Sequence, residues 1–88
     1  MKSITTEAGF TIELDEEAFD DLEVLDMLSE LTEDPLVLPK LLVKTLGKDG
    51  KAALYDFVRN DKGRVPPNEA MALFEEVMTL AGDKVKNS

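Results

Sequence analysis

The sequence contains no cysteine and no histidine among its 88 residues. The absence of cysteine excludes disulfide bonds, thiolate metal ligands and cysteine nucleophiles. The absence of histidine removes the most frequent general base and the most frequent neutral metal ligand. We therefore predict a protein that is not an enzyme and that uses no metal ion and no cofactor.

Long apolar segments are also missing. The longest apolar stretch comprises Leu36–Leu38 and Leu41–Val43, interrupted by Pro39 and Lys40. It is far shorter than the roughly 20 residues that a membrane span needs. Met1–Phe10 has no apolar segment of the kind that secretory signals contain. We expect an intracellular protein that does not contact the membrane.

Basic residues are scarce in the first third of the chain. The whole sequence has 19 acidic and 10 basic residues, a net charge of −9. Residues 1–34 hold twelve carboxylates and a single base, Lys2, whereas residues 35–88 carry a net charge of +2. Because nucleic-acid phosphates and anionic lipids repel such a chain, the composition disfavours DNA, RNA and membranes as partners.

The first fourteen residues have the pattern of a β-hairpin. Phe10, Ile12 and Leu14 alternate with polar residues, a period that is typical of a half-buried strand. Gly9 lies between two short runs, where a turn requires a positive φ. We predict a hairpin at residues 3–14, packed against helices because two strands alone are only marginally stable in water.

Beyond Asp15 the apolar residues follow helical spacing, which predicts four helices. Asp34 and Pro35 form an N-cap and a first helical residue, and Gly82 is a candidate helix stop. The predicted helices span residues 15–31, 36–46, 50–59 and 67–81. The fold class is thus mainly α, a small bundle of about four helices with a short N-terminal β-hairpin. We predict one domain at residues 1–82 and a polar, disordered tail at residues 83–88.

The first predicted helix is more apolar than one small core requires. Its apolar residues span an arc of about 220°, whereas a surface helix needs a stripe of about 100°. The rest of the fold can cover this surface, or the surface can bind other helices, for which flexible methionines are suited. On the second hypothesis the residues that line a client groove or a self-association face are Leu22, Leu25, Met27, Leu28, Phe74 and Met78.

Four lysines, Lys40, Lys44, Lys48 and Lys51, lie along one side of the second predicted helix and the turn after it. They can form a solvated stripe that offsets the neighbouring acidic helix at modest energetic value. Alternatively, this run of lysines, with Lys40 and Lys44 as its key residues, can form a docking edge for the acidic face of a second subunit in a head-to-tail arrangement.

Five short segments follow one another in a recognisable order. They are Phe10–Leu14, the acidic Asp15–Asp21 with Leu22–Leu28, Asp34–Leu42, Leu46-Gly47 and Arg59–Pro66. In the order and spacing of these segments, residues 9–82 resemble the small tail assembly chaperones of long-tailed bacteriophages and prophages.

The resemblance implies a non-enzymatic role in the host cytoplasm. Such chaperones bind the helical tape-measure protein, keep it soluble, help to recruit tail-tube protein around it, and are absent from the mature virion. A homo-oligomer is compatible with this role. The alternative function is that of an acidic phage-type inhibitor or DNA mimic that binds a basic host protein. An enzyme is a distant third possibility, because the sequence lacks histidine, cysteine and any nucleophile motif. A plain helical interaction domain is the default interpretation.

Overall fold

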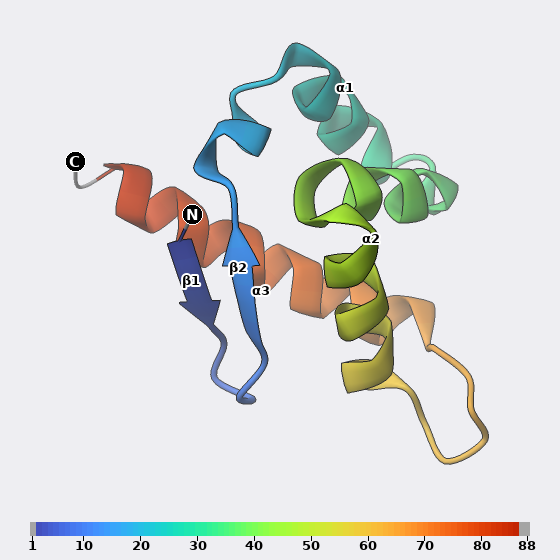
Figure 1. The fold of residues 1–88 in the computed structure, drawn as a ribbon. Helices are drawn as coiled ribbons and strands as arrows, with labels where there is room; N and C mark the ends of the chain where they lie inside the picture. The colour runs from blue at the N-terminus through green and yellow to red at the C-terminus, as the bar shows by residue number, and fades with distance from the viewer. Residues whose placement is uncertain (1, 87–88) are drawn as a thin grey trace.

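The computed structural model describes residues 2–86, which form an N-terminal hairpin followed by helices (Figure 1). The fold is mostly helical, as the sequence predicts. The elements in chain order are β1 (Lys2–Thr5), β2 (Thr11–Leu14), the 3₁₀ turn η1 (Glu16–Phe19), α1 (Leu22–Leu31), the 3₁₀ turn η2 (Pro35–Val37), α2 (Leu38–Val58) and α3 (Pro67–Lys86).

The hairpin is antiparallel and confirms the prediction for this segment. Ile4 lies opposite Ile12 in the register of β1 and β2. Gly9 has a φ of 97°, the conformation expected from its place in the turn. The Thr6 hydroxyl accepts a hydrogen bond of 3.1 Å from the backbone N–H of Phe10, so the buried Thr6 side chain is satisfied.

Aspartate side chains determine where the first helical segments begin. Asp15, Asp21 and Asp34 cap η1, α1 and η2, and each accepts a hydrogen bond from the backbone N–H two residues further on. The cap predicted at Asp34 is confirmed. The prediction that the first α-helix begins near Asp15 is wrong, because Asp21 is extended and starts a separate helix at Leu22.

The predicted count of four helices is not matched, since residues 2–86 contain three α-helices. The predicted second and third helices form the single element α2, in which Gly47 alone departs from helical geometry, with φ 78° and ψ 171°. Gly47 is a kink between the two helical halves of α2, and glycine adopts the positive φ of this kink at little cost. Gly50, the predicted first residue of the third helix, lies within the second half of α2.

The last helix is longer than predicted. α3 continues through Gly82 to Lys86, so residues 83–86 of the predicted disordered tail are helical, and residues 87–88 lie outside the described part. A glycine inside a helix costs about 1 kcal/mol relative to alanine. That cost alone does not end a helix.

One core joins the hairpin to all three α-helices. α3 packs against β1 and α2, while β2 and α1 both pack against α2; Figure 1 shows α3 crossing behind the hairpin and α2. The largest fully buried side chains are Phe74, Ile4, Leu14, Leu41, Leu42, Leu54, Val24 and Val77. Both strands and every α-helix contribute to this set.

The contact between β2 and α2 depends on Gly50. This glycine is buried in α2, and a Cβ at its position would lie 2.7 Å from Leu46 Cβ and 3.2 Å from Ile12 Cδ1. The missing side chain therefore lets the second half of α2 approach the hairpin closely.

We expect Gly50→Ala to destabilise the protein although alanine is the better helix former. Overpacking a closed contact costs about 1–3 kcal/mol, which exceeds the helix-propensity gain of about 1 kcal/mol. Urea denaturation monitored by circular dichroism measures the difference. Asp49→Ala, at the exposed neighbouring position, serves as the control and should change stability by less than about 0.5 kcal/mol. Equal stability of the Gly50 variant and the wild type would contradict this packing.

Candidate protein-interaction surface

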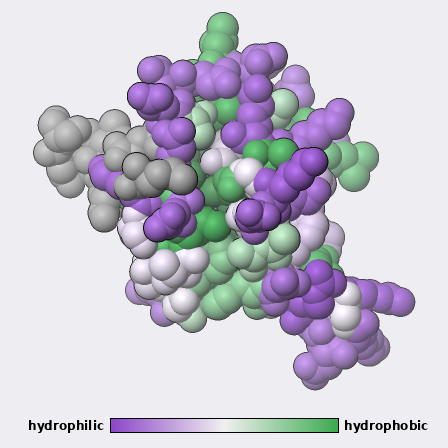
Figure 2. Space-filling model, viewed as in Figure 1, coloured by the Kyte–Doolittle hydropathy of each residue, from purple (hydrophilic) through white to green (hydrophobic). Residues whose placement is uncertain are grey.

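Two of the predicted binding residues, Leu22 and Leu25, are exposed side by side on α1. Their side chains are 80% and 52% exposed, whereas Val24 between them is fully buried. Leu22 and Leu25 line a shallow hollow together with Glu23 and Asp26, which we call the α1 hollow. Figure 2 shows hydrophobic atoms projecting above a hydrophilic surface at the α1 end of the molecule.

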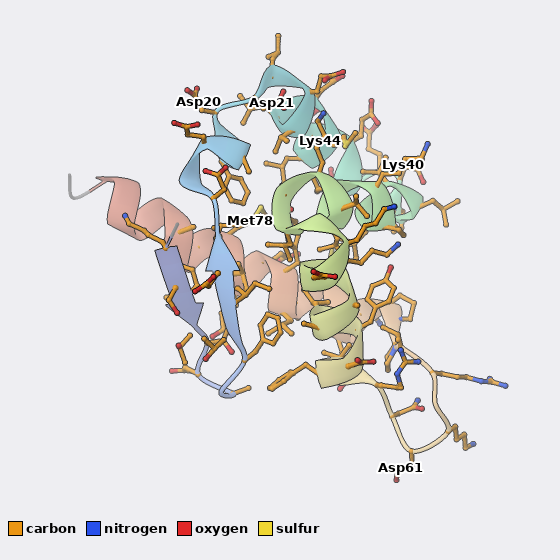
Figure 3. The ribbon with its side chains drawn as sticks, in the orientation of Figure 1. Asp20, Asp21, Lys40, Lys44, Asp61 and Met78 are labelled. Carbon is orange, nitrogen blue, oxygen red and sulfur yellow. The ribbon has the colours of Figure 1, made fainter. Side chains whose placement is uncertain are left out.

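The other four apolar residues predicted in the site are not on this surface. Met27 and Leu28 are half-buried against the core. Met78 is also half-buried against the core, and Figure 3 shows it beside β2. Phe74 is fully buried, so its assignment to an accessible groove is wrong.

The arrangement of the helices explains why these residues separate. α1 packs against α2 and the two 3₁₀ turns, whereas α3 packs against α2 and β1. Phe74 and Met78 come from α3 and face the shared core, while Leu22 and Leu25 lie on the outer side of α1. Helical spacing shows that both helices are apolar on one face, but it does not show which of those faces meet.

Leu36 is a further exposed leucine, and sequence reasoning did not identify it. Its side chain is 84% exposed, in η2 directly after the Asp34 cap. The only signal in the sequence is its position between that cap and the start of α2, ahead of the regularly spaced buried residues Leu38, Leu41 and Leu42.

Lys44 is used within the chain to join α2 to the acidic start of α1. Its Nζ lies 3.1 Å from Glu23 Oε1 and 3.7 Å from Asp21 Oδ2, and Figure 3 shows it extending toward α1. The hydrogen bond from Lys44 to Glu23, followed by the charges of Glu23 and Asp21, raises the pKa of Lys44 above its usual 10.5. Lys44 thus offsets part of the negative charge of α1.

The remaining lysines of the predicted stripe surround apolar side chains on α2. One shallow hollow of about 450 Å³ is lined by Val43, Lys48, Lys51, Ala52, Tyr55, Asp56 and Arg59. A second, of about 430 Å³, is lined by Pro39, Lys40, Val43, Lys44 and Lys51. The two hollows share Val43 and Lys51, and we call their union the α2 groove. Lys51 Nζ lies 5.4 Å from the centre of the Tyr55 ring, within the range of a cation–π contact.

Metal-binding clusters and membrane-spanning helices are two further features that bear on the function of a chain. Across residues 2–86, no cluster of three or more acidic side chains could hold a metal ion. In the same range, none of the helices has the length and apolar character required to cross a membrane. Comparison of the chain with protein-family models, curated proteins and solved structures finds no match.

The ion pair between Lys44 and Glu23 is expected to couple the two helices. A double-mutant cycle with Lys44→Ala and Glu23→Ala should give a favourable coupling free energy that decreases in 1 M NaCl, because the pair is exposed. Thermal unfolding of the four proteins at low and high salt measures it.

The pH dependence of this coupling follows from the raised pKa of Lys44. A group whose pKa is higher in the folded state stabilises that state below its unfolded pKa. The coupling should therefore be fully present at pH 8 and should fall as the pH rises through and above 10.5. A coupling that stayed constant up to pH 12 would show that the contact is not ionic.

Proposed function

We propose that this chain is a non-enzymatic tail assembly chaperone that binds an amphipathic helix of the tape-measure protein through the α1 hollow. The observation that carries the proposal is the pair of exposed leucines, Leu22 and Leu25, on a helix whose Val24 and Leu31 are buried in the core. The leucines are held at defined positions by a folded scaffold and remain accessible to a partner.

The apolar character of the hollow matches helix-in-groove recognition. In that mode, an amphipathic helix places its apolar face against exposed apolar side chains of the binding protein. Burial of one leucine contributes about 1.5–3 kcal/mol, so two leucines supply much of the energy of a micromolar complex, about 8 kcal/mol. The acidic rim, Glu23 and Asp26, favours a client with basic residues beside its apolar stripe.

The identity of the client comes from the resemblance of residues 9–82 to phage tail assembly chaperones. On this proposal the protein acts in the host cytoplasm, covers the tape-measure protein before the tail tube surrounds it, and is not retained in the virion. The strong negative charge of residues 1–34 supports the role, since it keeps chaperone–client complexes apart while apolar surfaces are engaged.

We expect Leu22→Asp/Leu25→Asp to abolish client binding without unfolding the protein, because both side chains are exposed. Losing the burial of two leucines corresponds to about 3 kcal/mol or more, at least a hundredfold in Kd. Co-expression with the tape-measure protein of the same genome, followed by affinity capture, measures the effect.

Leu36→Asp is the control, since it places an aspartate at a leucine that is as exposed as Leu22 and lies outside the α1 hollow. The single variant Leu22→Asp is its matched counterpart. Binding should survive in the Leu36→Asp variant. Unchanged capture of the tape-measure protein by the folded Leu22→Asp/Leu25→Asp variant would overturn the proposal.

The salt dependence of binding separates this function from that of an acidic inhibitor or DNA mimic. Binding through leucines should persist in 0.5 M NaCl, because screening weakens charge pairs and not apolar contacts. Capture of a basic host protein that is lost in 0.5 M NaCl, together with no binding of the tape-measure protein, would favour the inhibitor.

A further inference from the structure

The α1 hollow and the α2 groove are neighbours on the surface. Lys44 lines the α2 groove, and its ion-pair partner Glu23, 3.1 Å away, lines the α1 hollow. The Lys44–Glu23 pair therefore marks the boundary between the two concave surfaces. One continuous surface of the molecule holds both.

The two parts of this surface have opposite charge and similar apolar content. In the α1 hollow, Leu22 and Leu25 lie beside the carboxylates of Glu23 and Asp26. In the α2 groove, apolar side chains such as Val43 and Tyr55 are surrounded by cationic ones. The acidic, leucine-lined α1 hollow is therefore complementary in charge to the basic α2 groove of the same chain.

Within the described part of the chain, several cations of the α2 groove have no acidic partner. In residues 2–86, Lys44 is engaged by Asp21 and Glu23, but Lys40, Lys48 and Lys51 form no ion pair. Figure 3 shows Lys40 extending to the outside of the molecule. These three lysines can accept carboxylates from another molecule without giving up an internal ion pair, and Lys51 also lies over the Tyr55 ring.

We propose that the occupant of the α2 groove is the α1 hollow of a second copy of this chain, in a two-fold symmetric dimer. Because the two parts are adjacent on one surface, a half-turn of one copy places each acidic hollow on the basic groove of the other. Both sets of exposed leucines and both sets of lysines are then engaged at once. This inference goes beyond the proposed function, since it requires no client. The second copy and a client would use the same leucines, Leu22 and Leu25, so the client binds the dissociated chain.

A second copy fits this surface better than an unrelated acidic partner does. Away from this surface, two copies with a net charge of −9 each repel one another, so association requires the local match of charges. That match is present twice in a two-fold pair and only once when a foreign helix occupies the α2 groove.

A charge swap tests the pairing. Variant A carries Lys40→Glu and Lys48→Glu, and variant B carries Asp26→Lys and Glu30→Lys, which lie one turn apart on α1. All four positions are exposed and outside the core, and variant B keeps the Lys44–Glu23 ion pair. Sedimentation velocity over a concentration series in low salt measures the mass.

The wild type should approach twice the 9.7 kDa mass of the chain with rising concentration. Variants A and B should each remain monomeric, with at least a tenfold weaker association. An equimolar mixture of A and B should dimerise again, because each altered surface then meets a complementary one. Circular dichroism of each variant confirms that it is folded.

The control variant Lys62→Glu/Arg64→Glu changes the net charge as variant A does, but in the exposed loop before α3. It should dimerise like the wild type. A wild type that stays monomeric, variants that dimerise alone, or a mixture that stays monomeric would each overturn the proposal. Assemblies larger than a dimer would overturn the two-fold arrangement.

Dimerisation and client binding can be tested separately, so either proposal can fail without the other. Variant A retains Leu22 and Leu25, so it should still capture the tape-measure protein although it no longer dimerises. Loss of client binding in Leu22→Asp/Leu25→Asp with a monomeric wild type would leave the function standing and remove the dimer.

Discussion

Burial of one face of the hairpin against α2 and α3 is the interaction on which the rest of the structure depends. Two strands are marginally stable alone, so Ile4 and Ile12 must be covered, and both are buried in the core. Gly50 brings α2 close enough to contact Ile12, and α3 packs against β1. In a chain of 88 residues, this core occupies most of α2 and α3 and leaves α1 at the side.

The peripheral position of α1 explains why two of its leucines are exposed to solvent. It buries Val24 and Leu31 and keeps the neighbouring Leu22 and Leu25 exposed. The acidic residues around its start need compensation because their charges repel one another, and Lys44 of α2 supplies part of it. The same helix therefore combines two exposed leucines with electrostatic support from α2.

Sequence signals predicted correctly those features whose conformation is determined by neighbouring residues in the chain. Gly9 in its turn and Asp34 as a cap depend on residues within two or three positions, and both lie as expected. Gly47 has a positive φ and leaves helical geometry directly after residue 46, where the sequence predicts the second helix to end. The signal at Gly82 was misread as a helix end, because a glycine permits a helix stop or a continued helix alike. Which of the two occurs depends on what the following residues pack against.

By itself, the sequence determined the mainly helical composition, the hairpin, the charge polarity and the surplus of apolar residues on α1. These properties follow from residue order and from periods of two and 3.6 residues. Only the tertiary structure decided which apolar residues are accessible, since Phe74 and Leu25 follow the same periodicity and are 0% and 52% exposed. It likewise placed Lys44 at the boundary between an acidic and a basic surface, because contacts between distant segments depend on how the helices pack rather than on spacing along the chain.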